Sequence, residues 1–350
     1  MSAWAEADQV IDLYSADTLV RTQSEAQRAA GAKRALAEAL VRITGMPNAA
    51  DNPVVRDALN RAQDYIYEYS YLSTDDTIEG PDGEAVAASK LLLKFSAVQV
   101  QALLREAGLA FWPANRPSVL VWTVTNTQEG LTRAQDTDMR QHLRQQAAVR
   151  GLPVVLPLLD LEDYLALPAE SLWQLEQGAI REASERYRAS AILVMRSSQT
   201  SNDRWRGNWQ LIHNEGSVSG DSEADSNEAL MAEALNRVAD RFAALYAIHP
   251  SEGEAGSVVV SVNNVDDFAT YKAIERYLTD LALVLRVELS ALTDNRLLLR
   301  LFTEGDIAQL ENTLALDTRL VPASGGSLPN NRFLPRGIAE NPLLYQWQGR

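Results

Sequence analysis

Three uninterrupted runs of apolar residues lie in the middle of the chain, at Ser118–Val124, Leu152–Leu158 and Ala191–Met195. Apolar runs of this length, without alternation, are typical of strands that helices cover on both faces. Helical segments separate the three runs, so the stretch from Arg116 to Met195 predicts stacked β-α-β units with parallel strands. This stretch is the centre of a predicted mixed α/β domain that spans residues 114–249.

The connecting helices of this domain are expected at about Asp136–Arg150 and Glu170–Tyr187. Beyond them, Arg204–Ile212 alternates apolar and polar residues, which predicts an antiparallel strand. The segment Asn214–Asp225 is rich in Gly, Ser and Asp, so we expect it to be exposed to solvent. A long amphipathic helix over Asn227–Tyr246 is expected to close the domain.

The residues before this domain predict a helical α+β domain over residues 6–113. Its first strand is expected at Asp8–Leu13. Ser24 is a predicted cap for a long helix that ends near Thr44, and Gly45 follows as the expected left-handed residue that closes the helix. A second amphipathic helix is expected after Asn52 and Pro53.

Alternating tyrosines predict that this second helix ends near Tyr67 and continues as a half-buried strand. The acidic segment Asp75–Glu84 contains Gly and Pro and is expected to be a loop or hairpin tip. A strand at Lys90–Phe95 then leads to Ser96, the predicted cap of a helix over Ala97–Glu106.

The chain beyond a Gly- and Ser-containing linker predicts a compact module over residues 256–321. Its expected elements are strand Ser257–Val262, helix Phe268–Leu281, strand Val284–Leu292, strand Arg296–Phe302, helix Asp306–Leu314 and strand Arg319–Val321. This βαββαβ order resembles a ferredoxin-like module. Residues 322–350 lack periodicity but carry leucines and aromatic residues, so we expect an extended tail that lies against a folded domain or a partner.

Charge narrows the classes of partner. The 350 residues carry a formal net charge of −15, with a pI near 4.7. An acidic chain repels a nucleic-acid backbone, so we expect no nucleic-acid partner. No apolar run approaches the roughly 18–20 residues that cross a bilayer, so we expect no transmembrane segment.

The first residues predict export. Ala3-Trp4-Ala5 has the small-x-small pattern that signal peptidase cleaves, which places an expected cleavage site between Ala5 and Glu6. The charged and apolar parts of a signal peptide are largely absent from the sequence, so we expect it to begin within one. A chance Ala-x-Ala in an Ala-rich chain is the alternative. The chain has no cysteine, which suits an oxidising periplasm and excludes disulfides and cysteine-zinc sites.

Polar residues follow the predicted parallel strands. Right-handed crossovers are expected to bring Asn126, Asp160, Asp163 and Ser197 to one edge of the sheet, where open α/β sheets bind ligands. These four residues are the candidate pocket. In the alternative interpretation, Asp160 caps a short helix over Leu161–Leu165 and Asn126 lies in an ordinary turn.

Trp205 and Trp209 form a second candidate site for a ligand or partner. In the predicted strand they fall on one face, with Arg206 between them in sequence. Aromatic residues interleaved with Arg can bind a sugar or a partner strand, although two Trp on one sheet face more often cover a core.

The search for catalytic motifs is largely negative. The three histidines lie in unrelated segments, and neither HExxH nor GxSxG nor a glycine-rich phosphate loop occurs. A catalytic triad assembled in the fold or a carboxylate pair such as Asp160 with Asp163 or Glu162 stays open. We expect no metal site and no cofactor.

Several short motifs resemble a known family. They are Arg42–Gly45, Tyr69–Tyr71, Phe95 with Ala107–Leu109 and Trp112, Asn115–Trp122, Arg150–Pro153, Pro157–Asp160 and Arg186-Tyr187. On these motifs, the chain resembles the domain of unknown function family 2066. This family comprises uncharacterised exported proteins of gammaproteobacteria. The resemblance implies a periplasmic location and no known activity. More distantly, the predicted architecture resembles flagellar assembly protein T and the N-terminal domain of TolB.

These observations predict a non-catalytic periplasmic protein that binds or scaffolds cell-envelope proteins or peptidoglycan. The alternative is a periplasmic hydrolase or a sensor of a small ligand that uses the strand-end pocket around Asn126, Asp160 and Ser197.

Overall fold

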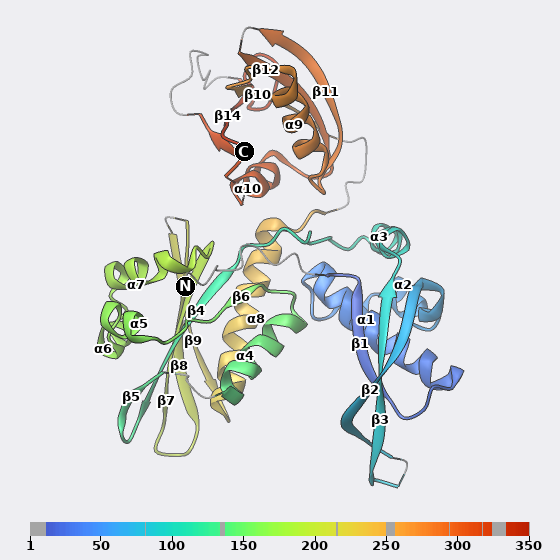
Figure 1. Cartoon of the computed structure of the whole chain (residues 1–350), viewed down its shortest axis with the longest axis vertical. Coiled ribbons are helices and arrows are strands. Elements are labelled where there is room, and N and C mark those ends of the chain that lie inside the picture. The colour runs from blue at the N-terminus through green and yellow to red at the C-terminus, as the bar shows by residue number, and fades with distance from the viewer. Residues whose placement is uncertain are drawn as a thin grey trace. The chain divides into compact units, whose positions relative to one another are not determined.

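The computed structural model of the chain is a mixed α+β structure, which in its described residues contains three β-sheets and ten α-helices (Figure 1). The described residues are 12–80, 82–133, 137–214, 216–249, 256–293, 295–316, 318–323 and 334–349. The chain divides into two compact units. One unit holds the residues up to 103 together with 114–244, and the other holds 104–113 together with the residues from 245 onward.

The first sheet of the first unit is antiparallel and has the strand order β1-β3-β2. Its elements are β1 (Ser15–Val20), α1 (Glu25–Thr44), α2 (Pro53–Leu59), β2 (Ile66–Glu79), β3 (Ala85–Phe95) and α3 (Ala97–Glu106). Helix α1 packs closely on this sheet because Gly31 has no side chain. A Cβ at Gly31 would lie 3.0 Å from side-chain atoms of Leu91 and Thr18.

The cap signals of α1 are confirmed. The Ser24 side chain accepts a hydrogen bond from the Gln27 amide, and Gly45 has the left-handed φ of 70°. The expected strand at Asp8–Leu13 is wrong for its described part, since β1 begins at Ser15 and the residues before 12 lie outside the described residues. There, Asp12 accepts hydrogen bonds from the backbone amides of Tyr14 and Ser15.

The second helix is shorter than its apolar stripe suggests. It ends at Leu59, and the strand that the tyrosines predicted begins at Ile66, although it is mostly exposed rather than half-buried. Strand β2 continues to Glu79, so only the residues around Gly80 form the expected hairpin tip. Pairing with β3 extends the strand through polar residues that carry no local strand signal.

The second sheet has the order β5-β4-β7-β8-β9, and β6 also pairs with β4. Its strands are β4 (Val119–Thr127), β5 (Gly130–Thr132), β6 (Val154–Val155), β7 (Ala191–Gln199), β8 (Trp205–His213) and β9 (Gly216–Ala224). Both β6 and β7 run parallel to β4, as predicted, whereas the other pairs are antiparallel. The expected strand at Leu152–Leu158 is reduced to the two residues of β6.

Helices cover both faces of this sheet. They are α4 (Thr137–Val149), α5 (Leu161–Ala166), α6 (Ala169–Trp173), α7 (Gln177–Ser184) and α8 (Asn227–Tyr246). Trp122 packs with Leu172 and Ile180 on the face of α5 to α7. On the other face, His213 contacts Phe242 of α8 with ring centroids 5.1 Å apart.

One expectation for this part is wrong, and another lacked the secondary structure. The single helix predicted at Glu170–Tyr187 is divided into α6 and α7, because Leu175 adopts a left-handed φ of 58° that a helix cannot contain. The segment Asn214–Asp225, which we expected to be exposed, is largely strand β9, and most of its residues are exposed. An exposed edge strand buries few side chains, so its polar sequence shows no apolar alternation from which the strand could be predicted.

The sheet of the second unit has the order β11-β12-β10-β14-β13. Its elements are β10 (Gly256–Asn263), α9 (Phe268–Thr279), β11 (Val284–Thr293), β12 (Arg296–Thr303), α10 (Ile307–Ala315), β13 (Leu320–Pro322) and β14 (Leu343–Trp347). The predicted βαββαβ order is observed as far as β13. Strand β14, from the expected tail, runs parallel to β10 and separates it from β13, with Leu343 and Tyr345 buried. A plain ferredoxin-like sheet has four strands, and this sheet has five.

Three short 3-10 helices complete the described elements, at Ala49–Asp51, Ala62–Tyr65 and Glu185–Tyr187. Within the described residues, no helix has both the length and the apolar character needed to cross a membrane.

Candidate functional site

Asp160 caps helix α5 and pairs with an arginine. Its Oδ1 accepts a hydrogen bond of 3.0 Å from the amide of Asp163, three residues along the chain. Arg186 donates to both carboxylate oxygens of Asp160, over 2.9 Å from Nη1 and 2.9 Å from Nη2. This bidentate geometry is the strongest form of arginine–carboxylate pairing. The alternative interpretation of Asp160 as a helix cap is therefore confirmed.

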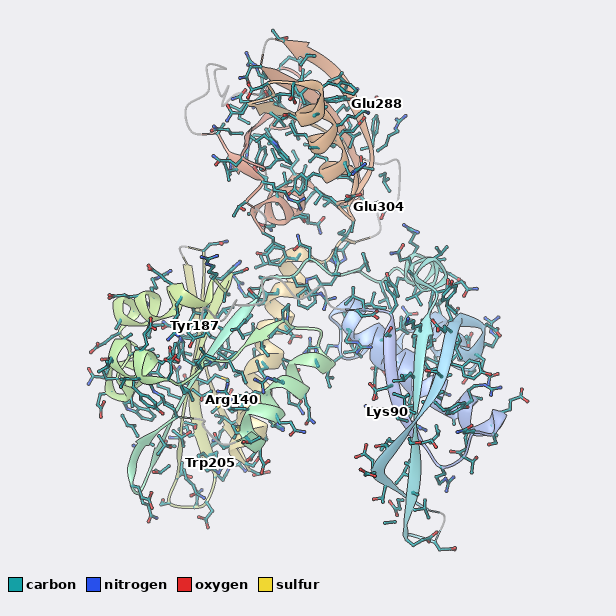
Figure 2. The ribbon with its side chains drawn as sticks, viewed as in Figure 1. Lys90, Arg140, Tyr187, Trp205, Glu288 and Glu304 are labelled. Atoms are coloured by element: carbon teal, nitrogen blue, oxygen red, sulfur yellow. The ribbon has the colours of Figure 1, made fainter. Side chains whose placement is uncertain are left out.

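Asp163 lies behind Asp160, and its side chain is 0% exposed. Its carboxylate accepts hydrogen bonds from the Tyr187 hydroxyl at 2.6 Å, the Leu159 amide at 2.7 Å and Arg186 Nη1 at 3.1 Å. We call Asp160, Asp163, Arg186 and Tyr187 the α5 clamp (Figure 2, which labels Tyr187). The clamp compensates a buried charge fully, and it holds Leu159 at a left-handed φ of 54°.

The clamp shifts the ionisation of its members. Hydrogen bonds from Arg186, and then from the Asp163 amide, lower the pKa of Asp160 to about 2. Burial, followed by the hydrogen bond to Asp163, raises the pKa of Tyr187 well above its ordinary value. At neutral pH, Asp160 is therefore an anion and Tyr187 a neutral donor. A carboxyl group with so low a pKa is poorly suited to general acid catalysis.

Arg133 lies next to the clamp and is only 8% exposed. Its guanidinium stacks over the ring of Tyr164 at 4.9 Å and faces the ring of Trp122 at 5.8 Å. Its Nη1 reaches the backbone oxygen of Asp163 at 3.5 Å, and burial lowers its pKa. The aromatic rings compensate this cation where hydrogen bonds are few.

Several apolar residues are exposed on α5 and just before it. They are Leu158, Leu161, Tyr164 and Leu165, which are 60%, 73%, 39% and 73% exposed, and we call them the α5 surface. Leu161 and Leu165 are four residues apart, so they lie on one face of the helix. Single exposed leucines are ordinary, whereas several close together are less common on the surface of a folded protein.

Asn126 and Ser197 lie in the sheet, apart from the hydrogen bonds of the α5 clamp. Thr125 pairs with Ser197 in the register of β4 and β7, and their hydroxyl oxygens are 3.0 Å apart. Because side chains alternate along a strand, Asn126 projects from the opposite face of the sheet. The four residues of the candidate pocket thus divide into Asp160 with Asp163, a buried Ser197, and an exposed Asn126.

Trp205 and Trp209 are half-buried residues of β8, and Figure 2 labels Trp205. They share one face of the strand, as expected from their spacing. Trp209 faces Gly220 of the edge strand β9, where a Cβ would lie 2.7 Å from the indole. Arg206 projects from the other face and lies 3.7 Å from Glu223. Trp209 thus covers a strand whose glycine makes room for it.

Metal-ligand clusters of three or more His, Asp or Glu side chains do not occur among the residues that the structure describes. Sequence reasoning missed Arg133, Arg186 and Tyr187 as members of the site. Arg186 and Tyr187 stood at the end of an expected helix, and nothing in their spacing linked them to Asp160, 26 residues earlier.

Comparison with known families does not support the expected resemblance to family 2066. A family described as domain of unknown function (DUF8605) matches residues 7–113. The resemblance to family 2066 is therefore wrong, and the architectural likeness to flagellar assembly protein T and TolB is withdrawn with it. The motifs behind that resemblance are short and built from common residues. No curated protein sequence matches the chain.

Proposed function

We propose that the protein is a non-catalytic binding or scaffold protein that holds cell-envelope partners, and that the α5 surface is one place where it holds them. The observation that carries this proposal is the arrangement of the polar and the apolar side chains around α5. The polar groups of the α5 clamp bond to one another, while Leu161 and Leu165 are 73% exposed on the outside of the same helix. A rigid support beneath exposed apolar side chains suits binding.

The energetics of the α5 surface favour a protein partner. Burying apolar area contributes about 25 cal/mol per Å², so four partly exposed large side chains offer a useful fraction of a binding free energy. Glu162, whose side chain is 70% exposed, lies among them. A partner surface with an apolar centre and a basic margin complements this arrangement.

The proposed compartment is the periplasm. The absence of cysteine supports it, and so does the cleavage pattern at Ala3-Trp4-Ala5, which lies outside the described residues. Fractionation of cells that express the full-length gene from its own start tests the assignment. Recovery in the osmotic-shock fraction supports export, and retention with a cytosolic marker contradicts it.

We also propose that β10 to β13 form a ferredoxin-like module into which β14 is inserted. The element order supports this proposal, since β14 is the one strand that a four-stranded module does not require. In the proposed protein, this module is a second structural platform for partners.

A hydrolase or a small-ligand sensor at Asn126, Asp160 and Ser197 is the weaker candidate. It requires the Asp160 carboxylate to leave Arg186, and the low pKa of Asp160 opposes the proton transfer that hydrolysis needs. A substrate turned over by the wild type and not by Asp160→Asn would favour this candidate.

The scaffold proposal is tested by cross-linking in intact envelopes. The full chain is compared with a Leu161→Ser/Leu165→Ser variant, and Val98→Ser is the matched control because Val98 is 78% exposed on a different helix. We expect one envelope protein that cross-links to wild type and control and is lost with the double variant. Equal recovery with all three chains contradicts a role for the α5 surface.

A further inference from the structure

Strand β11 forms an open edge of the five-stranded sheet (Figure 1). It has ten residues, and in the described part of the chain it pairs with β12 alone. Leu285, Leu289 and Leu292 along it are 50%, 47% and 61% exposed. Natural sheet edges are protected by short length, Pro, charged side chains or bulges. Strand β11 is long and lacks Lys and Pro, and its two charged residues, Arg286 and Glu288, have opposite signs. This edge is therefore suited to pairing with another strand.

Irregularities in β11 limit where such pairing is regular. The register with β12 shifts between Val284 and Arg286 and again between Leu289 and Ala291. Between these shifts, Arg286 to Leu289 pair residue by residue with β12. A bulge bends a strand and interrupts its hydrogen-bond ladder. An added strand would therefore pair regularly only with the central residues of β11, Arg286 to Leu289.

The sequence at this centre is self-complementary. Residues 285–289 read Leu-Arg-Val-Glu-Leu, with apolar residues at both ends and in the middle and opposite charges between them. Consider an antiparallel pair of two copies with a two-fold axis at Val287. Arg286 then faces Glu288 of the second copy, and Val287 faces Val287, whereas Leu285 lies at a register shift outside the regular part of the strand. Directly opposed unlike charges and apolar pairs are the contacts that stabilise strand pairing.

Neighbouring registers are unfavourable. A two-fold axis at Arg286 places two arginines directly opposite each other, and an axis at Glu288 places two glutamates opposite each other. Like charges in directly opposed positions destabilise a strand pair. The charge pattern thus selects the register centred on Val287.

The charged side chains are available for this exchange. Within one chain, Arg286 Nη1 lies 2.8 Å from Glu288 Oε1, and their side chains are 61% and 46% exposed. The Arg286 guanidinium also stacks over Phe302 at 4.1 Å, which holds it on the face that carries Glu288 (labelled in Figure 2). Pairing of two copies replaces the ion pair within each chain by two ion pairs between chains, without leaving a charge unpaired.

We propose that β11 is a self-association edge, through which two copies of this chain join their five-stranded sheets in an antiparallel pair centred on Val287. This inference does not depend on the α5 surface, because it uses a different surface. The paired segment is short, and it buries less area than the roughly 1,200–2,000 Å² of a standard interface. We therefore expect a reversible dimer with a dissociation constant on the order of 100 μM.

Sedimentation equilibrium of the full chain with reversed charges tests the proposal. Arg286→Glu and Glu288→Arg each place like charges opposite each other in a homodimer, so each variant alone is expected to associate at least about tenfold more weakly than wild type. An equimolar mixture of the two variants restores opposite charges in both pairs. We expect the mixture to associate like wild type, and the double variant Arg286→Glu/Glu288→Arg to do the same.

The controls separate this effect from a change in net charge. Arg181→Glu and Glu182→Arg, at exposed positions of α7, make the same charge changes away from β11 and are expected to leave association unchanged. Circular dichroism checks that each variant is folded. A wild type that stays monomeric up to about 500 μM overturns the proposal, since a dimer of the expected strength is then populated. So does a mixture of variants that associates no better than its components.

Discussion

Arg186 donates two hydrogen bonds of 2.9 Å to the carboxylate of Asp160, although the two residues are 26 positions apart in the sequence. The same guanidinium reaches Asp163, which has no exposed side-chain surface. One arginine thereby serves the cap of α5 and the buried charge behind it.

Replacing Arg186 by Met is expected to lower the free energy of unfolding by about 2–3 kcal/mol. The variant leaves a buried carboxylate at Asp163 with two donors, Tyr187 and the Leu159 amide, in place of three. Urea denaturation measures the change. Arg181→Met, on the exposed side of α7, is the control and is expected to stay within about 0.5 kcal/mol of wild type. Equal stability of the two variants would contradict the role of the clamp.

Acid is expected to weaken the α5 clamp through Asp160. Its pKa in the folded chain is about 2, below the value of about 3.9 for an unfolded aspartate. A group with a lowered folded pKa stabilises the fold above its unfolded pKa, and that stabilisation is lost as the pH falls towards the folded pKa. Between about pH 5 and pH 2, the urea midpoint of the wild type should therefore fall more than that of Asp160→Asn. Asparagine retains the helix cap, so parallel curves would exclude Asp160 as the titrating group.

Arg150 joins three helices within the first unit, and its side chain is 3% exposed. It donates to the Gly45 carbonyl oxygen at the end of α1 over 2.7 Å, to Asn236 Oδ1 over 2.8 Å and to Asp240 Oδ1 over 2.6 Å. We expect Arg150→Met to cost about 3 kcal/mol, because these acceptors lose a shared donor. Asp240→Ala should cost only about 1 kcal/mol, since its side chain is 54% exposed. Thermal or urea unfolding measures the loss of stability in both variants. A larger loss for Asp240→Ala than for Arg150→Met would contradict this prediction.

Gly31 is predicted to tolerate no large side chain. A Cβ there already lies 3.0 Å from side-chain atoms of Leu91 and Thr18, so Gly31→Val must push α1 away from the sheet. We expect a loss of about 1–3 kcal/mol, despite the better helix propensity of valine. Ala30→Val, one residue earlier at an exposed position, is the control for a valine in α1 and should cost no more than about 0.7 kcal/mol. A Gly31→Val variant at least as stable as the wild type would show that packing at Gly31 is loose.

Elements with a local signal were predictable. The cap pair Ser24 and Gly45 located α1 at both ends, because capping involves residues within a turn of one another. Strand β9 lacked such a signal, since an edge strand with polar residues resembles a loop in sequence. The apolar stripe beyond Leu59 did not continue the helix, because pairing with β3 outweighed helical periodicity.

The candidate site was predictable only in part. Asp160 and Asp163 were identified as candidates, and the capping role of Asp160 was recognised as an alternative. Their partner Arg186 was not, because an ion pair between distant segments leaves no spacing in the sequence. The pleat of β4 and β7 separates Asn126 from Ser197, and the face of each depended on a register that only pairing defines.

The sequence alone determined the element order of β10 to β13, the ends of α1 and the acidic, cysteine-free character of the chain. Each of these depends on neighbours along the chain or on composition. The tertiary structure decided that β14 lies between β10 and β13 and that Arg186 meets Asp160. Strand order and ion pairing depend on which distant segments pack against each other. The local pattern of residues does not specify these contacts.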